Sequence, residues 1–348
     1  MPPGLSIRRS NNNVDLIRFG GEYYMAFRTA PTHFASRETR LAVLRSPDGD
    51  RWQEEMQVHF SRDLREPRFF AFKGKLFFCF FDGGTQLLKF EPNRIHVCER
   101  APDGRWTEPR PVFRENYVVW RVKTRGDTAY MSVYYGRNLY GKGDEGEVRL
   151  LRSTDGYDWE PISDAPQIAD VGAEEGEFEF DADGNLVALV REEVHGGTLV
   201  CTAPKEDLTR WETRFTPYKV DSALLFRRGE DFYVLGRRNV AGPCWRGPSF
   251  LPESVQNAWS LVTYSLTRKR TALYKVNRGE RTLTPLFDLP SKGDTAFPGL
   301  AARDEHSYWL VNYSSPLEGL DWPWVFGQLL RSHLYRMQLS FAEPAPVQ

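Results

Sequence analysis

The chain has 348 residues, of which 41% are hydrophobic and 14% aromatic, and its 46 Lys and Arg side chains nearly balance 47 Asp and Glu. A formal net charge of −1 excludes the global basic field that drives binding to nucleic acid or to an anionic membrane surface. The hydrophobic content excludes a charge-driven disordered chain, and four scattered cysteines without a C-x-x-C pair exclude a disulfide framework and zinc or thioredoxin-type sites.

A unit of about 50 residues recurs along the chain, and it consists of an apolar strand, a tight turn and a second strand rich in aromatic residues. The first copy runs from Val14 to Phe19, turns at Gly20-Gly21 and continues to Phe27. The second strands of the copies begin at residues 23, 76, 129, 186, 232 and 308. No window of 11–18 residues shows a convincing helical stripe. The repeat therefore indicates six β-sheet units in series.

Short strands joined by Gly-marked hairpins at this spacing are the signature of a β-propeller blade. We predict an all-β fold in which residues 1–348 form a single six-bladed propeller of four-stranded blades. The expected blades are residues 13–60, 64–112, 116–165, 172–218, 219–290 and 293–343, and a strand at residues 5–9 is expected to close the ring. The longer step before the last repeat predicts an insertion in the fifth blade, with a long loop from Asn239 to Trp259.

Two turns share the pattern S-x-D-G-x-x-W, at Ser46 to Trp52 and at Ser153 to Trp159, and degenerate versions occur at residues 102–106 and 207–211. In such a turn the Asp accepts backbone N–H bonds, the Gly takes positive φ and the Trp packs between sheets. These turns are similar to the Asp-box, or BNR repeat, of the sialidase superfamily, whose propellers also have six blades. We expect them on the rim, so their Asp residues are not catalytic candidates.

The stretch from Glu175 to Arg191 is also similar to a sialidase pattern of Glu, strand, Asp-Gly turn, strand and Arg, and residues 294–300 are similar to the superfamily's last entry strand. The resemblance covers essentially the whole chain and implies a glycoside hydrolase-like enzyme. Its motifs are incomplete. The family's three substrate-binding arginines fall on Asn11-Asn12-Asn13, on Arg191 and on either Arg237 or Arg238, and its tyrosine nucleophile falls on Phe297.

Two other resemblances concern the acidic residues. Five-bladed arabinanase- and xylosidase-type glycosidases carry carboxylates on the innermost strands of separate blades, and Asp15 and Glu175 resemble their base and acid strands. The segment from Asp63 to Pro67 resembles an Asp-Leu-Arg-Asp-Pro strand found in a group of sialidase-like proteins to which we assign no substrate.

In a propeller the innermost strands converge on a central tunnel, whose mouth is lined by their entry residues and by the loops that leave the second strands. Glycoside hydrolysis needs two carboxyl groups across the scissile bond, one of them with a raised pKa. The catalytic candidates are Asp15 as base, Glu177 or Glu175 as acid, and Glu66 as pKa modulator or alternative partner. The substrate-binding candidates are arginines, aromatic residues, a loop histidine and an entry-strand aspartate, namely Arg28, His33, Arg68, Trp120, Arg121, Tyr135, Arg191, Arg237, Arg238 and Asp294.

Three functions remain open. The first is an enzyme that hydrolyses a terminal sugar, the second a glycan-binding propeller without catalysis, and the third a protein-interaction propeller. A tunnel mouth rich in acids and arginines favours the first two, so the expected partner is a carbohydrate, with no nucleic acid or membrane.

No cofactor or metal is expected, because the sequence has no P-loop, dinucleotide fingerprint or H-E-x-x-H motif. No signal segment is visible, so the chain as given is expected in the cytoplasm, and a chain trimmed of its signal would be secreted. The sugar, the stereochemistry, the role of the insertion and the oligomeric state remain open.

Overall fold

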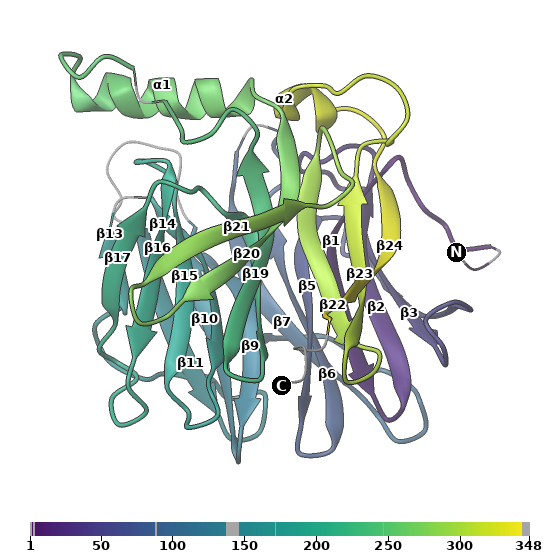
Figure 1. The fold of residues 1–348 in the computed structure, drawn as a ribbon. Coiled ribbons are helices and arrows are strands. Elements are labelled where there is room, and N and C mark those ends of the chain that lie inside the picture. Colours follow the sequence, from purple (N-terminus) through teal and green to yellow (C-terminus); the bar gives the residue numbers. More distant parts are fainter. Residues whose placement is uncertain are drawn as a thin grey trace, which may run out of the picture.

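Consecutive strands fold into six antiparallel sheets, which Figure 1 shows standing side by side around a common centre. The computed structural model describes residues 2, 4–87, 89–136, 146–170, 172–245 and 247–342. Blade 1 contains β1 (Ser10–Phe19), β2 (Glu22–Ala30), β3 (Arg40–Ser46) and β4 (Gln53–Val58). Blade 2 contains β5 (Asp63–Phe72), β6 (Lys75–Gly83), β7 (Pro92–Arg100) and β8 (Arg110–Val112). Blade 3 contains β9 (Tyr117–Arg125), β10 (Thr128–Tyr135), β11 (Gly146–Ser153), β12 (Glu160–Pro161) and β13 (Ile168–Asp170).

The second half of the chain repeats this arrangement. Blade 4 contains β14 (Ala173–Phe180), β15 (Leu186–Glu192), β16 (Gly197–Ala203) and β17 (Glu212–Thr216). Blade 5 contains β18 (Asp221–Arg228), β19 (Asp231–Asn239), β20 (Lys269–Asn277) and β21 (Thr282–Asp288). Blade 6 contains β22 (Thr295–Ala302), β23 (Ser307–Ser314) and β24 (His333–Ser340). The prediction of an all-β, six-bladed propeller is confirmed, and each second strand begins within one residue of its predicted start.

The aromatic residues pack between neighbouring blades. Phe70 and Phe77 of blade 2 stack with their ring centroids 4.7 Å apart, and Trp159 of blade 3 meets Phe70 edge-on at 6.1 Å. Trp159 belongs to an S-x-D-G-x-x-W turn, in which Asp155 accepts the backbone N–H groups of Tyr157 and Asp158 at 2.8 Å each. The turn therefore presents its Trp to the neighbouring blade, here the preceding one, and the Trp packs between sheets as the pattern predicts.

Glycine is required in these turns for two reasons. Gly49 has φ of +80°, a backbone conformation that costs other residues free energy. A Cβ atom placed on it would also lie 2.8 Å from Nε1 of Trp309 in blade 6. The turn of blade 1 thus packs tightly against the last blade.

The predicted closing strand at residues 5–9 is not formed, and blade 6 has three strands within the described residues. The backbone N–H of Arg8 donates to Thr29 of blade 1 instead of to β24. Contact across the closure comes from the next residues, because Ser332 N–H donates to Arg9 O at 3.1 Å and Asn11 N–H donates to Ser332 Oγ at 2.8 Å. The ring is thus closed at the start of β1.

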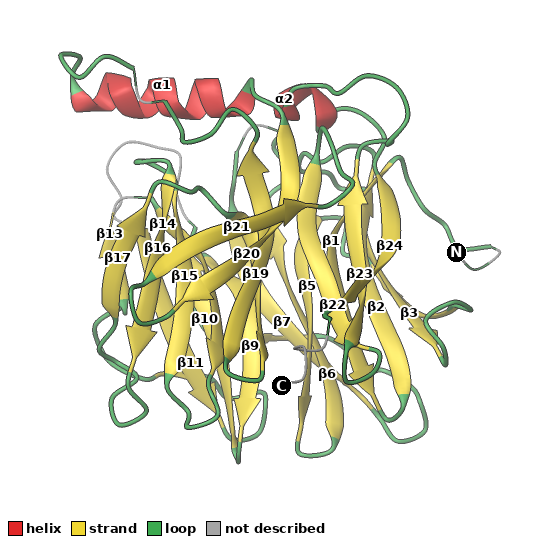
Figure 2. Cartoon of the chain, in the orientation of Figure 1, coloured by secondary structure: helices red, strands yellow, loops and turns green. Residues whose placement is uncertain are grey.

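The insertion in blade 5 is not a continuous loop, because it contains the helix α1 (Glu253–Ser265). A short second helix, α2 (Trp324–Gly327), follows β23, and Figure 2 shows both helices at one end of the strand assembly. The buried residues of α1 include Ser260 and Tyr264, whereas Val255 and Val262 are 42% and 58% exposed. An inward face that is partly polar does not produce the apolar stripe by which an amphipathic helix is recognised.

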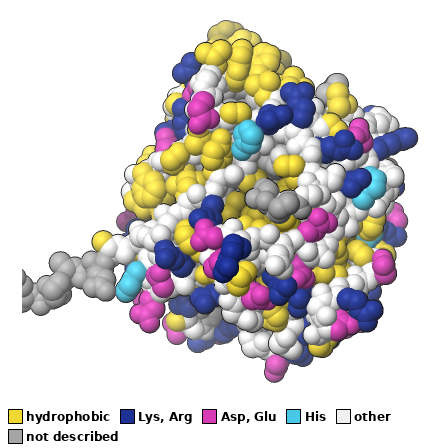
Figure 3. Space-filling model, turned by 90° about the vertical axis from the view of Figure 1, so that its right-hand side faces the viewer, with side chains coloured by type: hydrophobic (Ala, Val, Ile, Leu, Met, Phe, Trp, Pro, Cys, Tyr) yellow, Lys and Arg dark blue, Asp and Glu magenta, His cyan; other side chains and the backbone are white. Residues whose placement is uncertain are grey.

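Exposed apolar side chains gather near these helices. Figure 3 shows hydrophobic side chains at the top of one face, the end at which Figure 1 draws α1 and α2. Within the described residues, none of the helices has both the length and the apolar character required to span a bilayer.

Candidate active site

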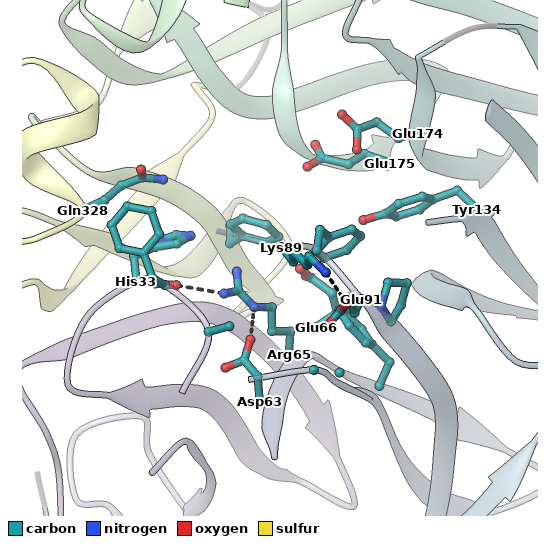
Figure 4. Close-up of a pocket in the computed structure, with 18 of the residues that line it drawn as sticks. His33, Asp63, Arg65, Glu66, Lys89, Glu91, Tyr134, Glu174, Glu175 and Gln328 are labelled. Atoms are coloured by element: carbon teal, nitrogen blue, oxygen red, sulfur yellow. Dashed lines mark hydrogen bonds and ion pairs between the residues drawn. The ribbon is translucent and has the colours of Figure 1, made fainter. Parts of the chain in front are cut away.

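A pocket opens at the centre of the propeller, between loops of blades 1 and 2 and the innermost strands of blades 2, 4 and 6 (Figure 4). Its volume is about 280 Å³, near the lower end of the range for small-molecule sites. Charged, polar and aromatic side chains line it, among them His33, Asp63, Arg65, Glu66, Lys89, Glu91, Tyr134, Glu174, Glu175, Arg191, Arg237, Phe297 and Trp324. It is therefore a small, mixed-polarity site of the kind that binds a polar ligand with an apolar face.

A repeated backbone irregularity aims side chains at this pocket. The pairing of each innermost strand with its neighbour shifts register once, between Asn12 and Asp15 in blade 1 and at the matching places in the other blades. Glu66, Glu175 and Phe297 occupy these bulges with φ of 52°, 51° and 48°. A bulge re-aims the side chain that it carries. The positions that face the pocket are thus set by the bulge rather than by alternation along the strand.

Glu66 is a buried carboxyl group with two partners. Asn13 Nδ2 donates to its Oε1 at 2.9 Å, and Arg68 lies 3.2 Å from its Oε2. Burial raises the pKa of Glu66 to about 7, because the loss of solvation outweighs the attraction of Arg68, and the charge of Glu175 raises it further. The group is therefore able to hold and release a proton near neutral pH.

Glu174 and Glu175 come from β14 in blade 4, and both bind Arg191. Glu175 accepts hydrogen bonds from Arg191 at 2.7 Å and from the backbone N–H of Ser222 at 2.6 Å. Glu174 lies 3.2 Å from Arg191 Nε, and its Oε1 has no hydrogen-bond partner in the described part of the chain. Burial, with the charges of Glu193 and Glu175, holds the pKa of Glu174 well above its usual value.

His33 and Asp294 form a buried pair at the opposite wall. His33 Nδ1 lies 2.7 Å from Asp294 Oδ2, and Asp294 Oδ1 accepts from Tyr313 and from Trp324 Nε1 at 3.1 Å each. Burial lowers the pKa of His33 despite the attraction of Asp294, so the imidazole is neutral at pH 7. Because a carboxylate accepts its hydrogen bond, Nδ1 carries the proton. The pair resembles a base and its orienting acid.

Five of the predicted site residues line the pocket. They are His33, Glu66, Glu175, Arg191 and Arg237. Asp294 is in contact with the pocket through His33.

Asp15 and Glu177 are not among the pocket-lining residues. Arg121 bridges them, with NH1 3.0 Å from Asp15 and Nε 2.8 Å from Glu177, and Asp15 also accepts the backbone N–H of Phe69. All three side chains are at least nine-tenths buried. This ion triad joins blades 1, 3 and 4, so its observed contacts are structural.

The remaining candidates do not line the pocket themselves, and their side chains contact other protein groups. Arg68 donates to Trp120 O at 2.6 Å and lies over the Trp120 ring, which packs against Phe297 at 5.4 Å. Arg28 holds the loop of residues 32–39 through Phe34 O and Asp63. Arg238 pairs with Asp288, and Tyr135 packs against Tyr117.

Several residues that line the pocket were not among the sequence-predicted site residues, including Asp63, Arg65, Tyr134 and Glu174. Arg65 donates to Asp63 at 2.5 Å and to the backbone oxygen of His33 at 2.9 Å (Figure 4). Tyr134 is adjacent to the predicted Tyr135, and adjacent side chains in a strand point to opposite faces. The sequence did not show which of the two faces the pocket. Because of the bulge in β14, Glu174 rather than Glu177 lines the pocket beside Glu175. Within the described ranges, no group of three or more His, Cys, Asp or Glu side chains is placed to hold a metal ion.

Comparison with known proteins identifies the fold. No protein-family model and no curated protein sequence matches the chain. Among solved structures, a protein of unknown function from Dyadobacter fermentans superposes with a TM-score of 0.70 and 14% identity over 97% of both chains. Trypanosoma rangeli sialidase in complex with sialic acid gives a TM-score of 0.63 and 12% identity, covering 90% of this chain and 53% of the sialidase. The endosialidase of phage phi92 gives a TM-score of 0.63 and 10% identity, over 96% of this chain and 67% of that one.

The chain thus spans about half the length of the Trypanosoma enzyme. At these identities the likeness establishes a sialidase-like propeller fold.

Proposed function

We propose that the protein is a glycoside hydrolase-like enzyme that removes a terminal sugar from a glycan, with Glu66 as general acid and Glu175 as its partner carboxyl group. One observation carries the proposal. Glu66 is buried in the central pocket with its pKa raised to about 7, and Glu175 lines the same pocket from two blades away. Two carboxyl groups of which one is protonated near neutral pH are what glycosidic cleavage requires.

In the proposed reaction, protonated Glu66 donates its proton to the glycosidic oxygen as the bond to the anomeric carbon breaks. Glu175 either attacks that carbon or takes a proton from the attacking water, depending on the separation of the two groups in the complex. Water supplies the new hydroxyl group of the released sugar. A small central pocket admits a chain end more readily than the middle of a chain.

Phe297 separates this proposal from a sialidase mechanism. It lines the pocket at the position where the sequence resemblance places the tyrosine nucleophile. A phenyl ring has no hydroxyl group, so the proposed chemistry uses the carboxyl pair instead. The same substitution favours one alternative, a propeller that binds a glycan without cleaving it.

A panel of aryl glycosides tests the two functions. We expect wild type to hydrolyse at least one of them, with kcat/KM falling above about pH 7 as Glu66 loses its proton. Glu66→Gln should lower kcat by about 10²- to 10⁴-fold and abolish that decline. Glu175→Gln should also be impaired.

Glu179→Gln is the matched control, because Glu179 is on the same strand as Glu175 but pairs with Lys123 outside the pocket lining. It should retain wild-type activity. Absence of turnover on every glycoside, together with a sugar-dependent rise in melting temperature, would rule out the hydrolase and support the binding alternative.

A further inference from the structure

The basic side chains that line the pocket already have carboxylate partners within the protein. Arg65 Nε lies 2.5 Å from Asp63, Lys89 lies 3.7 Å from Glu91 at the rim, and Arg237 lies 3.3 Å from Asp221. Arg191, the fourth, contacts several acids. Among the described pocket-lining residues, no Arg or Lys is left without an acidic neighbour.

Arg191 is the most heavily engaged of the four. Its Nε and NH1 lie 3.2 Å from Glu174 and 2.7 Å from Glu175, its Nε also lies 3.1 Å from Asp221, and NH2 pairs with Glu193. The guanidinium group has five N–H donors in a fixed plane. Because Nε, NH1 and NH2 are each already paired with a protein carboxyl group, a ligand carboxylate would have to compete for this guanidinium.

Arg237 has partners at NH1, at NH2 and on one face, while its buried Nε has no hydrogen-bond partner among the described residues. NH2 donates to Asp221 at 3.3 Å, NH1 donates to the backbone oxygen of Thr295 at 3.5 Å, and the guanidinium lies 4.3 Å from the centre of the Trp324 ring. Asp221 is therefore an acidic partner that Arg191 and Arg237 share. Burial opposes its ionisation, but Arg191, Lys219 and Arg237 lower the pKa of Asp221, so the shared charge is present at neutral pH.

The rest of the lining suits hydroxyl groups and an apolar ring face. Glu66 and Glu174, whose pKa values are raised by burial, can each donate a hydrogen bond as neutral acids. Oε1 of Glu174 is buried 3.2 Å from Arg191 Nε and makes no hydrogen bond in the described part of the chain. Phe34, Phe297 and Trp324 add flat apolar surface to the lining.

We propose that the pocket takes an uncharged sugar unit and discriminates against sugars that carry a carboxylate. The inference rests on the proposed function, because it names the substrate class of the same site. It also distinguishes this chain from its structural neighbour, the Trypanosoma rangeli sialidase described in complex with sialic acid. In this chain the arginines at the tunnel mouth pair with protein carboxylates, and a carboxylate ligand would have to compete with these partners and sit among Glu174, Glu175 and Asp221.

Matched ligand pairs test the inference directly. Methyl galactoside and methyl galacturonide, and the corresponding glucoside and glucuronide, differ only in oxidation of C6 to a carboxylate. Titration calorimetry and saturation-transfer NMR with wild-type protein at pH 7 should show at least one neutral member binding ten-fold or more tightly than its acidic partner. N-acetylneuraminic acid serves as a further acidic probe and should bind no better than the uronides.

Asp221→Asn provides an independent readout, because it removes the carboxylate charge that both arginines share. We expect the preference for the neutral ligand to fall several-fold in a variant whose circular dichroism is unchanged. Glu179→Gln, outside the pocket lining, is the control and should keep the wild-type preference. If Asp221→Asn does not fold, the ligand pairs with wild type still decide the question.

Tighter binding of the acidic member of a pair would overturn this inference and leave the hydrolase proposal standing. Binding of neither class by wild type would overturn the inference and the glycan-acting function together. Hydrolysis of aryl uronides in preference to the neutral glycosides would also overturn the inference while supporting the proposed enzyme.

Discussion

At the scale of single residues, a bulge in each innermost strand decides which acids face the pocket. Alternation along β14 places Glu175 and Glu177 on one face, which is why the sequence favoured both. The register shift between Glu174 and Glu177 breaks that alternation, so Glu174 and Glu175 line the pocket while Glu177 binds Arg121. A bulge has no strong sequence signal when it is occupied by Glu rather than Gly, so this change of face was not predictable.

Glu66 provides a stability prediction with a defined sign. Its pKa is raised in the folded state to about 7 from an unfolded value of 4.5. The stability that protonated Glu66 contributes is therefore fully present below pH 4.5 and is lost as the pH rises through about 7. The glutamine side chain of Glu66→Gln would not titrate, so this variant does not lose this stability. The difference between its free energy of unfolding and that of wild type should therefore increase by about 3 kcal/mol between pH 4 and pH 8.

Urea denaturation of both proteins across that range measures the difference. Glu179→Gln, a part-exposed substitution, should show no such trend. If the free energies of unfolding of Glu66→Gln and wild type differ by the same amount at every pH, Glu66 has the same pKa in the folded and unfolded states. That result would remove the support for its role as an acid.

At the scale of elements, α1 is held to blade 5 by a tyrosine rather than by an apolar stripe. Tyr264 is 2% exposed, donates its hydroxyl hydrogen bond to Asp221, and packs edge-on against Trp324 at 5.7 Å. Lys219 lies over its ring, 3.9 Å from the centroid. The helix thus covers the same Asp221 that pairs with the pocket arginines, which links the insertion to the site.

Tyr264→Phe should lower the free energy of unfolding by about 2 kcal/mol, because it removes a buried hydrogen bond to a charged group while keeping the ring. Amide hydrogen exchange in residues 253–265 should become faster, since the helix loses its polar anchor. Val262→Ala is the control; Val262 is 58% exposed, and its truncation should change stability by no more than about 0.5 kcal/mol. Equal exchange rates in Tyr264→Phe and wild type would show that other contacts hold the helix.

At the scale of the whole molecule, buried hydrogen bonds between residues far apart in the sequence contribute to closure of the ring, together with the packing of β1 against β22. Ser332 Oγ accepts from Asn11 N–H at 2.8 Å and donates to Asn11 O at 2.9 Å, across 321 residues of chain. Ser332 is 1% exposed, so water does not replace these bonds. The last blade has three strands among the described residues, and this buried contact joins it to the first blade without an added outer strand.

Ser332→Ala should destabilise the protein by roughly 2–4 kcal/mol, because two buried backbone groups of Asn11 lose a partner. The loss should be accompanied by faster hydrogen exchange in β1 and β24, the two sides of the closure. Ser340→Ala removes an exposed hydroxyl at the far end of β24, the strand that follows Ser332, and should be close to neutral. If both variants unfold at the same urea concentration as wild type, the closure does not limit the stability of the ring.

The sequence by itself determined the architecture. The six repeats, the glycine-marked hairpins and the S-x-D-G-x-x-W turns are local patterns, and local patterns specify strands and turns because short-range sterics and hydrogen bonds decide them. Glu66, Glu175, Arg191, Arg237 and His33 were identified for the same reason, since each lies next to a predicted strand end that must face the tunnel in a propeller.

Only the tertiary structure decided which of the polar residues share the pocket. Asp15, Arg121 and Glu177 come from three blades, and their ion triad exists because the ring brings those blades together. The helix α1, the absent closing strand and the pairing of every pocket arginine with an acid also depend on contacts between residues distant in the sequence. Such contacts follow from packing and charge neutralisation in three dimensions, for which a single sequence carries no local signal.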